Sequence, residues 1–360
     1  MKTHTCRMEH LEGRMLFAGY AAATVPELIA AMNAANASAE DDTISLAAGV
    51  SFSLTAVDNT SHGPTGLPVV TAGGGALAIT GNGATIGRPR FTGISFTPAF
   101  RLFDVAAGAS LTLGNITLQG GLAGSQMVTG LDGHADAWGA AVHNLGAVTL
   151  DAVTVLDNQA RGQAGYSQAG APGRVGLGGG IYSAGALTMT GCTVRNNLAY
   201  GGWGADAFAW GGVSNSAAPG GDGAGGGVYI AGGSAAITRT TFSSNTARGG
   251  KGGDGMESLP KAAAGGNGLG RGLFAAAGAV TVRSSTFTLN DATGTTGGLS
   301  YSRKSGGKLY APSGRGIGGG IYIATKGVTA SLDEFTVRNT AGNTSTTSDP
   351  DIFGRYTRIV

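Results

Sequence analysis

The stretch Gly178–Asn197, GGGIYSAGALTMTGCTVRNN, is the unit from which most of this chain is built. It has a glycine head, a short apolar strand, a small-residue turn, and a second alternating stretch that ends in asparagine. Related heads begin at Gly139, Gly225, Gly270 and Gly318, about 39 to 48 residues apart. Self-similarity at such a period is typical of solenoids and other repeat arrays.

Apolar and polar residues alternate within each copy, so one side chain in two should point into the interior. Aligning the copies gives four columns of similar residues: Leu111, Val148, Leu187, Ala235, Val280; Leu113, Leu150, Met189, Ile237, Val282; Ile116, Val153, Cys192, Thr240, Ser285; and Leu118, Val155, Val194, Phe242, Phe287. Stacking at the ~4.8 Å spacing of neighbouring strands would join these columns into one core. We therefore predict an all-β fold, a single right-handed parallel β-helix.

An asparagine follows the last column by three residues in four copies, at Asn158, Asn197, Asn245 and Asn290. Asparagine tolerates the left-handed backbone of a tight turn. Amide side chains stacked in register can also hydrogen-bond along the rod. We predict such an amide ladder. It should end in the fifth copy, where Asn339 comes one position early and Thr340 occupies the ladder position.

The N-terminal part differs from the repeats. Residues 24–36 are predicted to form a helix with Thr24 as N-cap, Pro26 in the first turn, and Leu28 on its apolar face with Ile29 and Met32. This helix would cover the open end of the rod. The first strands should lie within 43–54 and 76–86. We assign residues 24–360 to the β-helix domain, and residues 1–23 to an export segment that is disordered or removed.

Composition agrees with repeated strands and excludes several classes of protein. The chain has 68 glycines, 12% charged and 42% hydrophobic residues, and a net charge of +2. Its basic residues are scattered, so no nucleic-acid partner is expected. No apolar run approaches the ~18 residues of a membrane span. Cys6 and Cys192 are too few for a disulfide framework.

We expect no cofactor and no metal. The segment 249–257 fits a calcium-binding nonapeptide once, but that motif depends on tandem copies, and none follows.

Four glycine-rich segments separate the copies: Arg161–Leu177, Tyr200–Ala224, Arg248–Leu269 and Thr293–Ile317. Each is too long for a turn and has no apolar period. Connections of this length in a compact domain are usually functional or mobile. All four leave the coil at the same point, so they should project together from one side of the rod.

A column of rings follows the inward apolar residue of each head: His143, Tyr182, Tyr229, Phe274 and Tyr322. Alternation predicts that these rings point outward as one stripe, with flat faces suited to sugars or to a partner surface. The alternative is that the glycine-rich segments fold back over them. Trp203 and Trp210 lie in those segments, and Trp138 lies beside one; they fit either interpretation.

Catalytic groups are sparse. A glycosidase needs paired carboxylates, and a lyase would combine an acidic calcium cluster with a basic residue. The 21 acidic residues are scattered, and the densest titratable group is Asp132, His134 and Asp136 in a loop. We interpret that group as solvated loop charges and assign no catalytic residue.

Several segments resemble exported bacterial parallel β-helix proteins of the polymorphic outer-membrane-protein and pectate-lyase-like type. Residues 28–36, LIAAMNAAN, followed by DTISL at 42–46, resemble the capping helix and first strand of that family. Segments 77–86 and 103–108 resemble its early coils, and 351–354 its closing strand. Leu11–Phe17 resembles the N-terminal segment of exported planctomycete proteins. Ile29 stands where arginine is usual, and the family's cysteine-containing entry motif is missing.

The resemblance covers residues 24–358 and implies a secreted or cell-surface protein. It carries little function, because such proteins include surface proteins, adhesin-like passengers and polysaccharide-active enzymes. We expect a non-catalytic module that binds a polysaccharide or another surface protein through Tyr182, Tyr229, Phe274, Tyr322, Trp203 and Trp210. The alternative is a polysaccharide lyase or glycoside hydrolase. A third interpretation, a passenger fragment, is disfavoured because no anchor sequence follows Val360.

Overall fold

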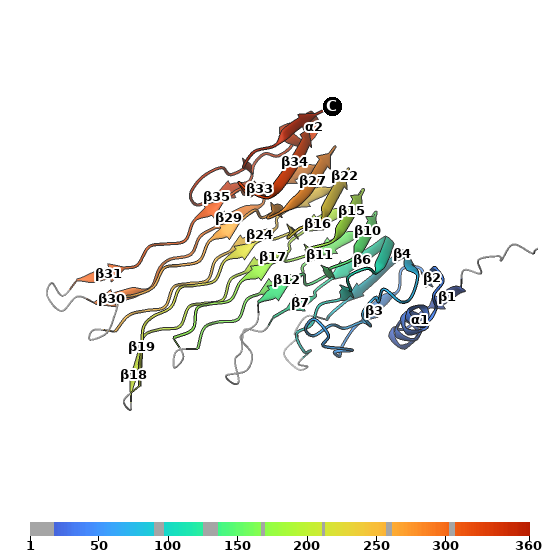
Figure 1. The fold of residues 1–360 in the computed structure, drawn as a ribbon, viewed down its shortest axis with the longest axis horizontal. Coiled ribbons are helices and arrows are strands. Elements are labelled where there is room, and N and C mark those ends of the chain that lie inside the picture. Colours follow the sequence, from blue (N-terminus) through green and yellow to red (C-terminus); the bar gives the residue numbers. More distant parts are fainter. Residues whose placement is uncertain are drawn as a thin grey trace, which may run out of the picture.

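The computed structural model describes residues 18–89, 97–124, 136–166, 170–210, 213–256, 261–301 and 307–360. The chain winds into a parallel β-helix whose coils stack along one rod, with the N-terminal helix at one end and the C-terminus at the other (Figure 1). The predicted all-β solenoid is confirmed. Among the described residues, no helix combines the length and apolar character needed to cross a membrane.

One coil shows the plan. It runs through β13 (Gly176–Leu177), β14 (Ile181–Ser183), β15 (Ala186–Thr190), β16 (Thr193–Arg195) and β17 (Leu198–Tyr200). Each strand pairs in parallel with its counterparts in the coils on either side. Corresponding strands of successive coils therefore form the sheets that run along the rod.

The sheet that includes β13 also contains β8 (Ala137–Trp138), β20 (Gly223–Ala224), β25 (Gly268–Leu269) and β32 (Gly316–Ile317). The sheet of β14 contains β5 (Phe103–Val105), β9 (Val142–Asn144), β21 (Val228–Ile230), β26 (Leu273–Ala275), β33 (Ile321–Ile323) and β36 (Ile352–Phe353). The sheet of β17 contains β7 (Leu122–Ala123), β12 (Gln159–Arg161), β24 (Thr246–Arg248), β29 (Asp291–Thr293) and β35 (Thr344–Ser345).

The largest sheet contains both β15 and β16. The strands of other coils that stack in one row with β15 are β6 (Ser110–Gln119), β10 (Ala147–Asp151), β22 (Ser234–Thr238), β27 (Gly278–Arg283), β34 (Val328–Asp333) and β37 (Thr357–Ile359). The strands that stack in one row with β16 are β11 (Thr154–Leu156), β23 (Thr241–Ser243) and β28 (Thr286–Thr288). At the N-terminal end the sheet continues through β1 (Ala18–Ala22), β2 (Asp42–Leu46), β3 (Ser51–Ser53) and β4 (Ala76–Gly87).

The predicted columns are the observed core. Leu187 pairs in register with Val148 and Ala235, and Val194 with Val155 and Phe242. All of these side chains are buried. The rings of Phe242 and Phe287 stack with centroids 4.4 Å apart. Like residues stack because the parallel register places equivalent positions of successive coils directly above one another.

The amide ladder is present and fully buried. Nδ2 of Asn158 donates to Oδ1 of Asn197, Asn197 to Asn245, and Asn245 to Asn290, each at 3.0 Å. The left-handed residue is not the ladder asparagine but the one before it, as at Asn196 (φ 56°) and Leu289 (φ 56°). The ladder residues therefore serve as hydrogen-bond links rather than as turn formers.

The predicted ladder end at Thr340 is wrong. Nδ2 of Asn290 donates to Oδ1 of Asn343 at 2.9 Å, and Asn343 in turn donates to Asp351. The short helix α2 (Glu334–Arg338) lengthens this coil, so that Thr340 forms a bridge with Phe287 in the last apolar column. Asn343 then follows Thr340 by the usual three residues. The sequence alignment missed it because α2 shifts the register.

The capping helix is also confirmed. Helix α1 (Val25–Ala37) has Thr24 as N-cap in a capping box with Glu27, and it buries Leu28 and Met32 against the first coil. Strand β1 pairs with β2 just before this helix, so the β-helix begins ahead of Thr24. Of the predicted export segment, residues 1–23, residues 1–17 lie outside the described residues, and residues 18–22 form β1.

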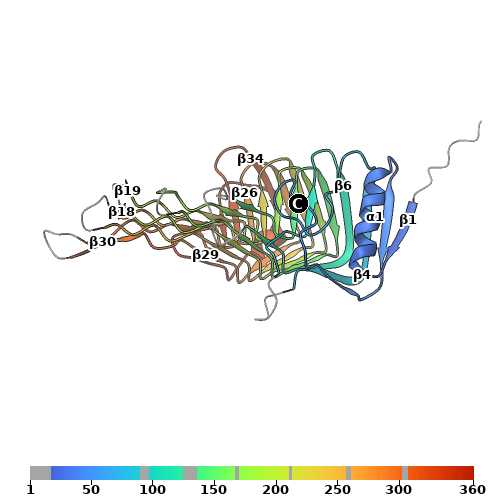
Figure 2. The ribbon, with the colours of Figure 1, turned by 90° about the horizontal axis from the view of Figure 1, so that it is seen from below.

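The glycine-rich segments project together from one side of the rod, as expected (Figures 1 and 2). We call their parts 162–175, 201–222, 249–267 and 294–315 the glycine slab. Hairpins β18–β19 (Phe208–Trp210, Val213–Asn215) and β30–β31 (Leu299–Tyr301, Lys308–Tyr310) lie at its outer edge. Where the structure describes them, these segments are ordered by hydrogen bonds between coils.

Hydrogen bonding in the slab repeats every third residue. The N–H groups of Gly201, Gly204 and Ala207 donate to carbonyls of Arg248, Lys251 and Asp254 in the next coil. Other residues bond the returning chain, as when Gly250 donates to Gly221 and Gly221 to Gly202, at 2.8 and 2.9 Å. A hydrogen-bond period of three residues, with the bonds made to neighbouring segments, matches the three-residue turn of a polyproline II helix, which has no internal hydrogen bonds.

Glycine is required by this packing. A Cβ on Gly202 would lie 1.9 Å from the carbonyl oxygen of Gln163, and one on Gly250 would lie 1.8 Å from that of Gly202. Neither distance is compatible with a side chain. The abundance of glycine thus reflects backbone-to-backbone contact in a layered slab, rather than the freedom of mobile loops.

Candidate functional site

A groove lies over β12, β17 and β24 of the sheet β7-β12-β17-β24-β29-β35, where the glycine slab leaves the coils. The central alanines of these strands, such as Ala160, Ala199 and Ala247, are buried, so the residues on either side of them face outward. The groove has a volume of about 530 Å³ and is lined by Gln159, Arg161, Asn196, Asn197, Leu198, Tyr200, Thr246 and Arg248.

Two arginines flank a tyrosine in this groove. Arg161, Tyr200 and Arg248 are register partners on three successive strands. The guanidinium carbon of Arg248 lies 5.8 Å from the centre of the Tyr200 ring, within cation–π range. Nε of Arg161 donates to Oε1 of Gln159 at 2.8 Å. Burial lowers the pKa of Arg161, but an arginine stays protonated at neutral pH.

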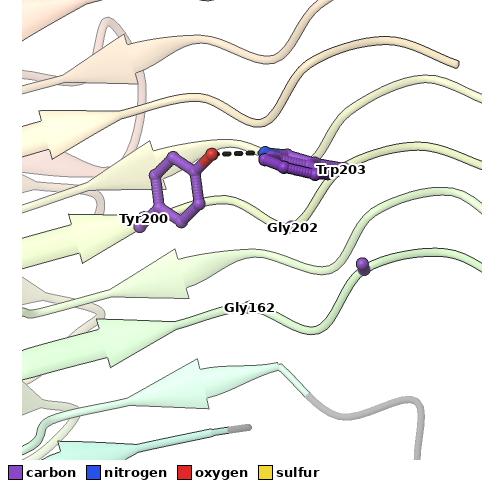
Figure 3. Close-up of a pocket in the computed structure, with 5 residues that line it drawn as sticks. Gly162, Tyr200, Gly202 and Trp203 are labelled. Atoms are coloured by element: carbon purple, nitrogen blue, oxygen red, sulfur yellow. Dashed lines mark hydrogen bonds between the residues drawn. The ribbon is translucent and has the colours of Figure 1, made fainter. Parts of the chain in front are cut away.

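The same tyrosine lines a second, smaller pocket of about 90 Å³ at the start of the slab. Figure 3 shows Tyr200 and Trp203 side by side, with Nε1 of Trp203 donating to the hydroxyl of Tyr200. Gly162 and Gly202 complete the lining together with Ala164. The Trp203 side chain is 57% exposed, so an aromatic surface continues outward from the arginine-lined groove.

The groove presents positive charge, hydrogen-bond donors and aromatic faces together. None of its eight lining residues is acidic. Such a surface suits a chain of sugar rings that carries carboxylate or sulfate groups, because stacking and charge-assisted hydrogen bonds act on different parts of each unit.

The predicted aromatic column forms a continuous stack. Tyr182 stacks on Tyr229 with ring centroids 5.6 Å apart, Tyr229 on Phe274 at 4.9 Å, and Phe274 on Tyr322 at 4.6 Å. Trp138 and His143 extend it at one end, and Phe353 at the other.

The rings of this column are less exposed to solvent than the alternation of inward and outward residues predicted. His143 and Phe274 are buried, and the three tyrosines are only partly exposed. Burial raises the pKa of Tyr182, and that of Tyr229 to about 12. At one end Trp138 of β8, which precedes the bend at Gly139 (positive φ), stacks on Tyr182 and covers part of the column.

The remaining predicted residues do not join one site. Trp203 lies beside Tyr200, apart from the ring column. The side chain of Trp210, and the whole of Asp132 and His134, lie outside the described residues. Oδ1 of Asp136 accepts the N–H of Val175 at 3.1 Å, which is a structural contact between coils.

Asp254, from the calcium-like nonapeptide, is also engaged by its neighbours. Its carboxylate pairs with Lys251 at 2.7 Å and accepts the N–H of Leu299 at 2.8 Å. Its pKa is lowered: burial opposes ionisation, but the hydrogen bond from Lys251 and that from Leu299 favour the carboxylate.

Arg161, Tyr200 and Arg248 were not predicted from the sequence as site residues. A signal was present, because each residue closes the tripeptide that follows a ladder asparagine: Gln159-Ala160-Arg161, Leu198-Ala199-Tyr200 and Thr246-Ala247-Arg248. Reading this tripeptide as a further strand would have placed the three side chains in one outward column.

Comparison with protein-family models gave no match. Comparison with curated proteins also gave none.

Proposed function

We propose that this protein is an exported or cell-surface, non-catalytic β-helix that binds an acidic polysaccharide. The groove over β12, β17 and β24 would hold the polymer, and Trp203 would extend its contact onto the glycine slab. The observation that carries the proposal is the register of Arg161, Tyr200 and Arg248, which sets a ring between two cations at strand spacing. Export is supported by the N-terminal resemblance to planctomycete proteins described above.

An acidic polymer fits the groove better than a neutral one. The residues that line the groove include Arg161 and Arg248 and no acidic residue, so an incoming uronate or sulfate group would meet positive charge. Guanidinium groups bind carboxylates through paired, charge-assisted hydrogen bonds. The Tyr200 ring between them would take the apolar face of a sugar.

The ring column is a second surface of the same binding protein. Tyr182, Tyr229, Phe274 and Tyr322 lie on another sheet, and their stacking stabilises the coils. The partly exposed edges of the three tyrosines would contact a partner surface. We place the main polysaccharide contact at the arginine-lined groove, because it combines open volume with charge.

Binding to polygalacturonate oligosaccharides, measured by isothermal titration calorimetry, tests the proposal. Arg248→Ala and Tyr200→Ala should each weaken binding at least about tenfold, the effect expected of central interface residues. Binding should also weaken with added salt, because exposed charges are screened. Arg355→Ala, which removes an exposed arginine near the C-terminus, is the matched control and should bind like the wild type.

The fully methyl-esterified polymer is the ligand control, since it keeps the sugar rings but lacks the charge. Equal affinity for both polymers, or equal affinity in Arg248→Ala and Arg355→Ala, would contradict the proposal. Release of reducing ends or unsaturated uronides from either polymer would instead establish the polysaccharide lyase or glycoside hydrolase alternative.

A further inference from the structure

Three side chains from separate parts of the sequence converge at the N-terminal end of the rod. Asp104 in β5 and His143 in β9 are register partners on neighbouring strands. His62 comes from the segment between β3 and β4. Nδ1 of His62 lies 2.7 Å from Oδ2 of Asp104, and Nδ1 of His143 lies 2.8 Å from Oδ1. One carboxylate is therefore shared by two imidazoles.

The cluster is buried on one side and open on the other. Asp104 is fully buried and His143 is 1% exposed, whereas the His62 side chain is 39% exposed. A solute would therefore approach from the His62 side, and the shared carboxylate would become accessible when the His62 side chain moves. The ring of Trp138 stacks on His143 with centroids 6.1 Å apart.

We propose that His62, Asp104 and His143 form a site for a divalent transition-metal ion, for which the donor set favours Zn²⁺. Their candidate ligand atoms all lie within 4.8 Å of one another. Two imidazole nitrogens and one carboxylate oxygen suit zinc, while calcium and magnesium prefer oxygen ligands alone. Three protein ligands with an open side match zinc sites in which water takes the fourth position.

Metal binding would require the side chains of the cluster to adjust. Ligands about 2.1 Å from a tetrahedral zinc ion lie about 3.4 Å from one another. The contacts of 2.7 and 2.8 Å between the imidazoles and Asp104 would therefore have to lengthen, and the candidate ligand atoms, which lie within 4.8 Å of one another, would have to adjust to that spacing. His62 is the side chain with room to move, because it is the exposed member. The metal would replace the two hydrogen bonds that the Asp104 carboxylate now accepts from the imidazoles.

One neighbour opposes a dication. Arg101 is buried, and its Nη1 donates to the backbone carbonyl of His62 at 2.7 Å. Its charge repels a metal ion in this partly buried setting. The same hydrogen bond also holds the His62 segment beside Asp104. We therefore expect micromolar rather than nanomolar affinity for zinc.

Calorimetric titration of the chelator-treated full chain with ZnCl₂ tests this proposal. Cys6→Ser serves as the reference background, because a thiol in the N-terminal segment would be a competing ligand. One zinc per chain should bind. In that background His62→Ala and Asp104→Asn should each weaken this event at least about tenfold, whereas Ser61→Ala, an exposed neighbour, should leave it unchanged.

Paramagnetic Co²⁺ locates the ion independently. It should quench tryptophan fluorescence in the reference protein, and Trp138→Phe should remove most of that quenching because Trp138 stacks on His143. The absence of saturable zinc binding, equal zinc affinity in His62→Ala and the reference, or quenching that persists in Trp138→Phe would overturn the proposal. The cluster would then be a hydrogen-bond network only. None of these measurements involves a polysaccharide, so they test the zinc site independently of the proposed function.

Discussion

The coil body and the glycine slab share one axial repeat but are held together differently. In the body, each coil adds inward side chains such as Val194 and Phe242, and the gain comes from removing apolar surface from water. In the slab, residues such as Gly221 and Gly250 contribute backbone hydrogen bonds to neighbouring coils. Each of those bonds adds only about 0.5–1.5 kcal/mol net.

This difference shows why the slab depends on the body. Glycine loses more conformational entropy on ordering than any other residue, and the slab has little apolar surface to offset that loss. The coils fix both ends of every slab segment at the strand spacing, so neighbouring segments begin already aligned. We therefore expect damage to the body to abolish both regions, and damage to the slab to remain local.

The largest effect should come from a charge in the core. Val194→Asp places a carboxylate among Val155 and Phe242 without a partner, and burying such a charge is strongly unfavourable. The variant should fail to fold, as seen by loss of the cooperative melting transition in circular dichroism. Thr188→Asp, on the exposed side of β15, is the control and should melt like the wild type. An unchanged melting temperature for Val194→Asp would show that the assigned register is wrong.

A smaller effect is expected at the amide ladder, which borders both regions. Asn197→Ala removes donations to Val155 and Asn245 and leaves buried partners unsatisfied. The free energy of unfolding should fall by about 1–3 kcal/mol, measured by chemical denaturation. Asn33→Ala, an exposed position of α1, should not lower it. Equal losses at both positions would argue against a structural ladder.

The slab itself should respond locally. Gly250→Ala would place a Cβ 1.8 Å from the carbonyl oxygen of Gly202, so the layers must separate. Amide hydrogen exchange should accelerate in slab segments 201–207, 218–222 and 249–255, while strands β15 and β16 remain protected. Gly114→Ala is the matched control, because a Cβ there has no atom within 4 Å. Faster exchange across the whole rod would mean that the slab holds the body together.

The smallest effect concerns the ring column on the body. Burial raises the pKa of Tyr229 to about 12, above its ordinary value of 10.0. The neutral phenol therefore stabilises the fold fully below pH 10, and this contribution is lost as the pH rises toward 12. The difference between ultraviolet titrations of the wild type and Tyr229→Phe should have its midpoint near pH 12. A midpoint near pH 10 would show that the column is open to solvent.

The sequence by itself determined the coil register, the capping helix and the buried ladder. Alternation decides which side chains face inward, and a recurring unit such as Gly178–Asn197 repeats that decision in every coil. The end of the ladder, which was predicted at the wrong residue, follows the same spacing once α2 is included. Thr340 lies in the last apolar column, and Asn343 follows it by three residues, as in the other coils.

Only the tertiary structure decided how the glycine-rich segments pack and which polar side chains meet. Slab hydrogen bonds join backbone groups of different coils, and a glycine-rich segment has no side-chain pattern from which these bonds can be predicted. The groove of Arg161, Tyr200 and Arg248 likewise arises from strand stacking across coils. His62 reaches Asp104 from an irregular segment 42 positions earlier in the chain. Local periodicity predicts which residues face inward or outward, whereas contacts between side chains of distant segments depend on the path of the chain through space.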